Sequence, residues 1–101
     1  MLNFIYNAGA GNGRGKKYMD IISAELTRRN IDFATFETTR PKQATQIAKD
    51  ISQSGQTQII AVGGDGTINE VFNGIDPEKD VFGIIPAGTG NDFIESCHIP
   101  H

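Results

Sequence analysis

The chain alternates between short apolar runs and longer stretches in which apolar residues recur every three or four positions. The runs predict strands at residues 2–6, 31–37, 58–62 and 81–85. After each of the first three runs comes the spacing of a helix that buries one face. The predicted buried stripes are Tyr18, Ile21, Ile22 and Leu26, then Ala44, Ile47, Ala48 and Ile51, then Ile68, Val71, Phe72 and Ile75.

Glycine and proline mark the expected helix ends. Helical spacing starts at Arg14 in the first helix, and Pro41 suits the first turn of the second. Gly55 and Gly74 are predicted to stop the second and third helices. Strand and helix therefore alternate at intervals of about 25 residues. This alternation predicts an α/β fold of three layers, with a parallel sheet between helices.

Length and charge narrow the function. A chain of 101 residues suits one domain with a modest core. It has 9 Lys and Arg against 12 Asp and Glu, and a net charge of −3 argues against a nucleic-acid partner. Cys97 is its single cysteine, which excludes an intrachain disulfide and favours an intracellular setting. No signal peptide or span of about 20 apolar residues is evident, so we expect a soluble, cytoplasmic protein that can touch a membrane surface.

The segment Gly63-Gly64-Asp65-Gly66-Thr67 follows the third predicted strand and carries the strongest functional signal. Three glycines around an acid exceed what a turn needs. Glycines let a ligand approach the backbone, and the N–H groups of the turn and the next helix form an anion site. A carboxylate inside such a site indicates a metal ion or a proton transfer. A branched side chain at Gly64 is expected both to strain the turn and to fill the phosphate space.

The first loop, residues 7–15, carries four glycines. It matches neither the dinucleotide fingerprint nor the Walker A loop, because Lys17 stands where the latter needs serine or threonine. A phosphate contact and a plain strand-to-helix turn both remain open for it. Thr38 and Thr39 end the second strand, where threonines are most often strand residues or helix caps.

Polar residues continue into the third helix and the last loop. Thr67 suits a helix cap, and Asn69, Glu70 and Asn73 follow at helical spacing, on either a solvated face or a site. The last loop, residues 86–92, repeats the sequence of strand, glycines, threonine, amide and acid. One of Asn91 and Asp92 suits a helix N-cap, which does not exclude a second role. We expect no metal site from the terminal residues Cys97, His98 and His101, because they are too few to close one.

Two segments together resemble a known family. They read Gly63-Gly64-Asp65-Gly66-Thr67-Ile68-Asn69-Glu70-Val71 and Gly83-Ile84-Ile85-Pro86-Ala87-Gly88-Thr89-Gly90-Asn91-Asp92-Phe93. Both resemble the catalytic domain of the diacylglycerol kinase family, which includes bacterial lipid kinases, sphingosine kinases and ceramide kinases. The opening loop is similar to the family's Asn-Pro-x-x-Gly motif, with Ala8 in place of proline. Lys42-Gln43 stands where the family often has Gly-Asp.

The resemblance implies an ATP cleft between this α/β domain, similar to the N-terminal domains of phosphofructokinases and NAD kinases, and a following β-sandwich domain. It implies Asp65 at the phosphates or Mg²⁺, and Asn91 and Asp92 near the acceptor. The implied nucleotide contacts are Asn7, Ala8, Gly9, Ala10, Gly11, Thr38, Gly64, Asp65, Gly66, Thr67, Ile68, Asn69, Glu70 and Thr89.

Family members run to about three times this length, so residues 1–101 are expected to form an N-terminal nucleotide-binding domain whose second domain is missing. The parent enzyme would transfer the γ-phosphoryl group of ATP to a lipid hydroxyl, and the isolated domain would turn over little. Two alternatives stay open. One is a kinase of a soluble nucleotide, related to NAD kinases, which share the Gly-Gly-Asp-Gly-Thr motif. The other is a non-catalytic nucleotide-binding or regulatory module.

Overall fold

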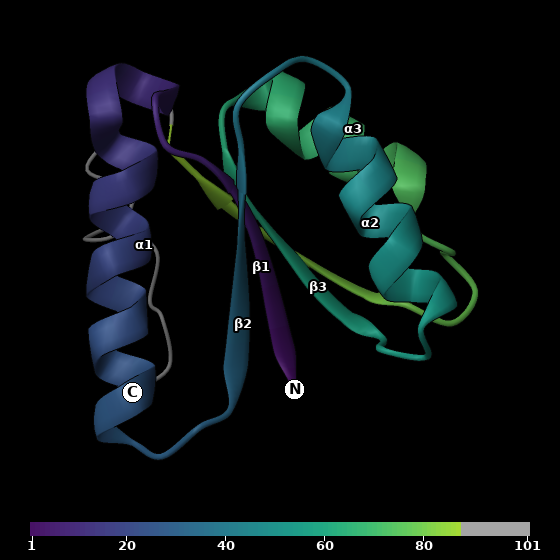
Figure 1. Ribbon diagram of the computed structural model, residues 1–101, viewed down its shortest axis with the longest axis horizontal. Coiled ribbons are helices and arrows are strands. Elements are labelled where there is room, and N and C mark those ends of the chain that lie inside the picture. The colour runs from purple at the N-terminus through teal and green to yellow at the C-terminus, as the bar shows by residue number, and fades with distance from the viewer. Residues whose placement is uncertain (88–101) are drawn as a thin grey trace.

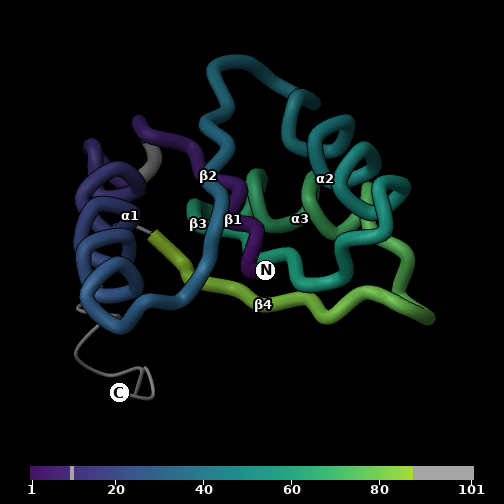
Figure 2. The backbone as a smooth tube through the Cα atoms, turned by 60° about the horizontal axis from the view of Figure 1, so that its bottom comes forward, coloured from purple at the N-terminus to yellow at the C-terminus, as the bar shows by residue number. Residues whose placement is uncertain are grey.

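The computed structural model describes residues 1–87, apart from the side chain of Ala10. Within this range a four-stranded parallel sheet has the strand order β2-β1-β3-β4. Helix α1 covers one face, and α2 and α3 cover the other (Figures 1 and 2). The predicted three-layer α/β fold is therefore confirmed. The elements are β1 (Leu2–Asn7), α1 (Ala10–Arg28), β2 (Phe33–Thr38), α2 (Gln43–Gln53), β3 (Gln58–Gly63), α3 (Asp65–Gly74) and β4 (Val81–Pro86).

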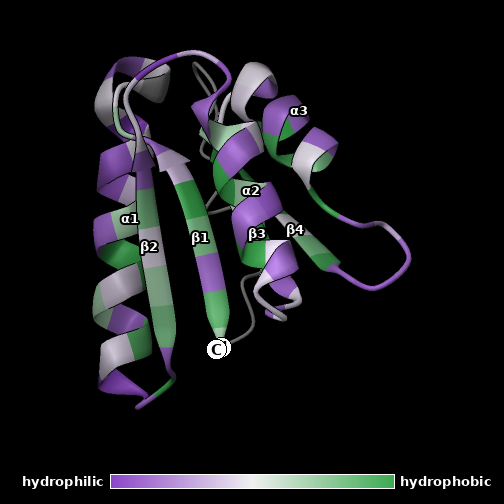
Figure 3. Ribbon diagram, turned by 45° about the vertical axis from the view of Figure 1, so that its right-hand side comes forward, coloured by the Kyte–Doolittle hydropathy of each residue, from purple (hydrophilic) through white to green (hydrophobic). Residues whose placement is uncertain are grey.

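Successive side chains along each strand point to opposite faces of the sheet, so the hydrophobic core has two parts, one on each face. Phe4 and Val62 pack with α1, whereas Ile5 and Ala61 pack with α2 and α3. Apolar colour follows the strands and the inner faces of the helices in Figure 3. Full burial of a side chain such as Ile5 contributes about 1.5–3 kcal/mol. Asn3 is buried among them because its amide donates to the carbonyl oxygens of Met1 and Gln58, each at 3.2 Å.

Three apolar residues lie outside their predicted places. Ile31 precedes β2 and is exposed, because the strand begins at Phe33. Ile21 is 48% exposed, and Met19 packs beside Tyr18 in the core instead. Phe72 is 50% exposed beside the edge strand β4, where the centroid of its ring lies 5.6 Å from the ring centroid of Phe82.

None of the helices in residues 1–87 is long and apolar enough to cross a membrane.

Gly74 is the last residue of α3, and its role is close packing as well as termination. A Cβ there would overlap the carbonyl oxygen of Thr45 and lie 2.8 Å from the Cβ of Ala48. The Thr45 hydroxyl also donates to the carbonyl oxygen of Glu70 at 2.7 Å. The small residue thus lets the backbones of α2 and α3 approach each other closely.

Two positions at the ends of α2 adopt left-handed backbone angles. Gly55, with φ of 95°, follows the C-cap Ser54 and ends the helix as predicted. Lys42 precedes the helix with φ of 68°, a conformation that favours glycine. This is the position where the resemblance places a glycine, and the chain adopts the same turn with a lysine.

Candidate functional site

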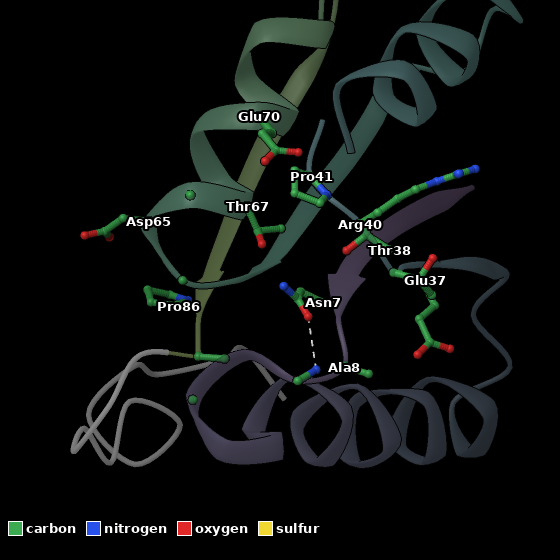
Figure 4. Close-up of a pocket in the computed structure, with 16 residues that line it drawn as sticks. Asn7, Ala8, Glu37, Thr38, Arg40, Pro41, Asp65, Thr67, Glu70 and Pro86 are labelled. Carbon is green, nitrogen blue, oxygen red and sulfur yellow. Dashed lines mark hydrogen bonds between the residues drawn. The ribbon is translucent and has the colours of Figure 1, made fainter. Parts of the chain in front are cut away.

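An open pocket of about 900 Å³ lies at the carboxyl ends of the strands (Figure 4). Chain order reverses between β1 and β3, since β1 leads to β2 on one side while β3 pairs on the other. Ligands of open parallel sheets bind at such a switch point. The pocket is lined by Asn7, Ala8, Gly9, Gly11, Glu37, Thr38, Thr39, Arg40, Pro41, Gly64, Asp65, Gly66, Thr67, Glu70, Pro86 and Ala87.

The loop from β1 into α1 forms one wall of the pocket. The Asn7 side chain accepts a hydrogen bond from the Gly9 N–H at 3.0 Å, which fixes the start of the turn. Gly11, Asn12 and Gly13 then have φ of 59°, 59° and 90°. Regular helix therefore begins only at Arg14, as the apolar spacing predicts. Two of these three left-handed residues are glycines, which adopt such angles without steric cost, and the third is an asparagine, which also tolerates them.

The turn from β3 into α3 forms the opposite wall. A Cβ on Gly63 would lie 2.9 Å from the Cβ of Thr67, so the helix start packs directly on this glycine. Gly64 is the N-cap in an extended conformation, with φ of −80° and ψ of −177°. The expected strain of a side chain at Gly64 is therefore wrong. The space beside the turn is open, since a Cβ at Gly64 or Gly66 has no atom within 4 Å.

The first half of α3 places three polar side chains along the pocket, those of Asp65, Thr67 and Glu70. Thr67 lies inside the helix and makes no side-chain cap bond, so its prediction as a cap is wrong. In Figure 4 Thr67 and Asn7 face each other across the pocket, while Asp65 extends away from both. Within residues 1–87, no hydrogen bond or ion pair ties the carboxylates of Asp65 and Glu70. Both carboxylates are available to a ligand.

The third wall follows β2. Thr38 is 7% exposed, and its hydroxyl donates to the carbonyl oxygen of Tyr6 at 3.3 Å. This bond holds the ends of β1 and β2 together and leaves the Thr38 oxygen only its acceptor capacity for a ligand. Next to it, the Gln43 side chain accepts from the Thr39 N–H at 2.7 Å. The β2–α2 loop is thus fixed by its own bonds.

Most of the predicted nucleotide contacts meet in this pocket, but two do not. Ile68 and Asn69 line a neighbouring groove of about 380 Å³ with Phe72, Phe82 and Ile84, and Asp65 lines both this groove and the pocket. Helical geometry explains why these residues line different places. Thr67 and Glu70 are three positions apart and lie on one face of α3, whereas Ile68 and Asn69 lie on another. Ala10 begins α1, and its side chain is outside the description. Thr89, Asn91, Asp92, Cys97, His98 and His101 also lie outside the described residues.

Six pocket residues are absent from the predicted contacts: Glu37, Thr39, Arg40, Pro41, Pro86 and Ala87. The signal for Arg40 and Pro41 was present, because they follow two threonines at the end of a strand. Ala87 belongs to the last loop, and its N–H donates to the Gly63 carbonyl at 2.8 Å. That bond joins the end of β4 to the central turn.

Comparison with known proteins shows which family the chain resembles. The sequence matches the diacylglycerol kinase catalytic domain over residues 1–101. A diacylglycerol kinase of Bacillus subtilis (strain 168) is 39% identical over 98 residues, covering 95% of this chain and 32% of that protein. One of Staphylococcus haemolyticus (strain JCSC1435) is also 39% identical, with 95% and 30% covered. The crystal structure of a diacylglycerol kinase from Bacillus anthracis str. Sterne has a TM-score of 0.73 at 31% identity, covering 98% of this chain and 35% of that one. The chain thus spans about a third of the length of these relatives.

Proposed function

Because the chain belongs to the diacylglycerol kinase catalytic domain family, we propose that it forms the nucleotide-binding part of an ATP-dependent lipid kinase. The observation that carries the proposal is the pocket at the switch point between β1 and β3. Two of its three walls are the glycine-containing loops that resemble the family's motifs. The reaction would move the γ-phosphoryl group of ATP to a lipid hydroxyl and release ADP.

The phosphates would bind at the start of α3. Gly64 and Gly66 leave open space there, so phosphate oxygens can reach the backbone N–H groups at the positive end of the helix dipole. The Thr67 hydroxyl would donate to a phosphate oxygen, and Asn7 would close the opposite side. Such contacts hold the phosphoryl group in position, which is the larger part of catalysis in this type of reaction.

The carboxylates of Asp65 and Glu70 suit Mg²⁺, which proteins hold through one or two carboxylates together with substrate phosphates. Mg²⁺ would offset the charge of the phosphates during transfer. Asp65 would be one of the residues that hold this ion. Among residues 1–87, no group of three or more His, Cys, Asp and Glu side chains is arranged to hold a metal.

We further propose that catalysis requires a second domain. The relatives are about three times as long as this chain, and the resemblance implies that a β-sandwich domain supplies a general base and further acids. Residues 1–101 alone would then turn over little. The lipid acceptor would be met at a membrane surface, in transient contact with a cytoplasmic enzyme.

A phosphate-transfer assay on the full-length polypeptide that carries this chain tests the proposal. Labelled ATP is offered with diacylglycerol vesicles and NAD side by side, and label is expected in the lipid. Label in NAD alone would show a soluble-nucleotide kinase instead. ATP binding without transfer to either acceptor would show a regulatory module. Gly64→Val serves as the control, since it fills the phosphate space without backbone strain and is expected to abolish transfer.

A further inference from the structure

We propose that Arg40 is a phosphate-contacting residue of this pocket, binding the phosphate chain of the nucleotide with its guanidinium group. The inference rests on the proposed nucleotide function. No family motif in the sequence includes Arg40, and its position only becomes meaningful when the β2–α2 loop is seen at the pocket (Figure 4).

The pocket is lined mainly by negative charges, so a bound phosphate chain needs a positively charged side chain nearby. Three carboxylates line it, those of Glu37, Asp65 and Glu70. Of the lining residues that the structure describes, Arg40 alone carries a positive charge. A nucleotide phosphate chain adds several negative charges to this surface. Among the described residues that line the pocket, Arg40 is the side chain that can offset them directly.

Several other cations of the chain are already engaged elsewhere. Lys16 pairs with Asp20 at 3.2 Å, and Arg28 and Arg29 both pair with Glu25 at the far end of α1. By contrast, the exposed Arg40 guanidinium has no hydrogen bond or ion pair with any residue in 1–87. All the N–H donors of this guanidinium group are therefore available to a ligand.

The backbone of Arg40 is fixed although its side chain is free. Thr38 on one side is tied to Tyr6, and the Arg40 carbonyl accepts from the Gln43 N–H at 3.4 Å. Pro41 restricts the next backbone angle. In Figure 4 the side chain extends past Thr38, away from Thr67 and Asn7. Rotation about its side-chain bonds from this fixed root brings a planar group with five donors over the pocket, and that geometry suits phosphate.

Calorimetric titration of the full-length polypeptide with ATP and with adenosine tests the contact. Arg40→Ala is expected to weaken ATP binding about tenfold or more and to leave adenosine binding unchanged, because only ATP carries the anionic group. Arg40→Lys is expected to fall between the wild type and the alanine variant. Lys42→Ala is the matched control, since Lys42 is an exposed cation two residues away that does not line the pocket.

Two results would overturn the inference. One is an ATP affinity within twofold of wild type in Arg40→Ala, and the other is an equal loss for adenosine and ATP. The proposed function fails separately. If wild type binds ATP but labels no lipid, the lipid kinase is excluded while the effect of Arg40 on ATP affinity is still measured. If wild type does not bind ATP, both are overturned.

Discussion

The charged side chains at the two ends of the sheet differ in whether they have partners. At the end where β3 and β4 begin, the Lys79 ammonium donates to the carbonyl oxygen and hydroxyl of Ser52 at 2.6 and 3.1 Å. The fully buried carboxylate of Asp80 accepts from the Asp76 N–H at 2.7 Å. At the end where the strands finish, Asp65, Glu70 and Arg40 have no such partners within residues 1–87.

The difference shows how one small domain separates stability from function. Polar groups that satisfy one another contribute to folding but offer nothing to a ligand. Polar groups without partners contribute little to folding and retain their full binding capacity for a ligand. We call the end with Lys79 and Asp80 the closed end and the end with Asp65, Glu70 and Arg40 the open end. Substitutions of the charged residues at the closed end should therefore change the free energy of unfolding. Substitutions of those at the open end should change ligand binding or turnover.

The largest expected effect is at the open end. Asp65→Asn is expected to lower kinase turnover of the full-length polypeptide about a thousandfold, equivalent to about 4 kcal/mol, because the charge at the phosphates is lost. Its unfolding midpoint in urea is expected to match that of wild type, since Asp65 is exposed and bonds to no described residue. Wild-type turnover in this variant would exclude the catalytic role of Asp65.

Gly74→Ala is expected to destabilise the fold by about 3 kcal/mol, because its Cβ overlaps the backbone of α2. Urea denaturation monitored by circular dichroism measures the change. Gly66→Ala is the matched control in the same helix, since its Cβ enters open pocket space. The control is expected to keep its stability and lose ATP affinity. A Gly74→Ala variant as stable as wild type would contradict the close approach.

Asp80→Ala is expected to cost about 2 kcal/mol at pH 7, because it removes the acceptor of the Asp76 N–H and the partner of Lys79. Burial raises the pKa of Asp80, but the Asp76 N–H, the Ser52 hydroxyl and Lys79 outweigh it and hold this pKa below its ordinary value. The contribution is therefore present above the unfolded pKa of about 4 and is lost as the pH falls through the folded pKa.

Urea titrations at pH 7, 5, 4 and 3 measure this dependence. The difference in the free energy of unfolding between wild type and Asp80→Ala is expected to become smaller as the pH falls below about 4. Glu25 loses its own contribution at lower pH, because hydrogen bonds from Arg28 and Arg29 lower its pKa to about 2. Both proteins lose the contribution of Glu25, so the difference in their free energy of unfolding is unchanged by it. A difference that becomes larger as the pH falls would exclude the proposed role of Asp80.

The smallest effect is expected at the rim of the pocket. Lys42→Gly is expected to stabilise the fold by about 0.5 kcal/mol, because relief of the left-handed backbone slightly exceeds the added entropy of the unfolded chain. The urea midpoint is expected to rise, with ATP affinity unchanged. A lower midpoint would show that the turn holds lysine without strain.

Apolar spacing was enough to predict the order of the elements and the parallel sheet, because buried strands and one-sided helices have different periods. It also located the start of regular helix at Arg14. It misplaced Ile21 and Phe72, since a stripe of apolar residues is wider than the surface that the neighbouring elements cover. The sequence likewise assigned Gly74 only as a helix stop, because the approach of Thr45 is a property of packing between helices.

For the site, the sequence by itself determined which loops follow the strands and therefore which loops share one edge. The glycines around Asp65 predicted a phosphate turn there, because a backbone that binds anions needs space. Only the tertiary structure decided which side chains meet there. It turned Thr67 and Glu70 toward the pocket and Ile68 and Asn69 toward another groove, and it brought Arg40 to the rim. The physical reason is that loop position follows from strand order, whereas the direction of a side chain depends on the helix phase and on its neighbours.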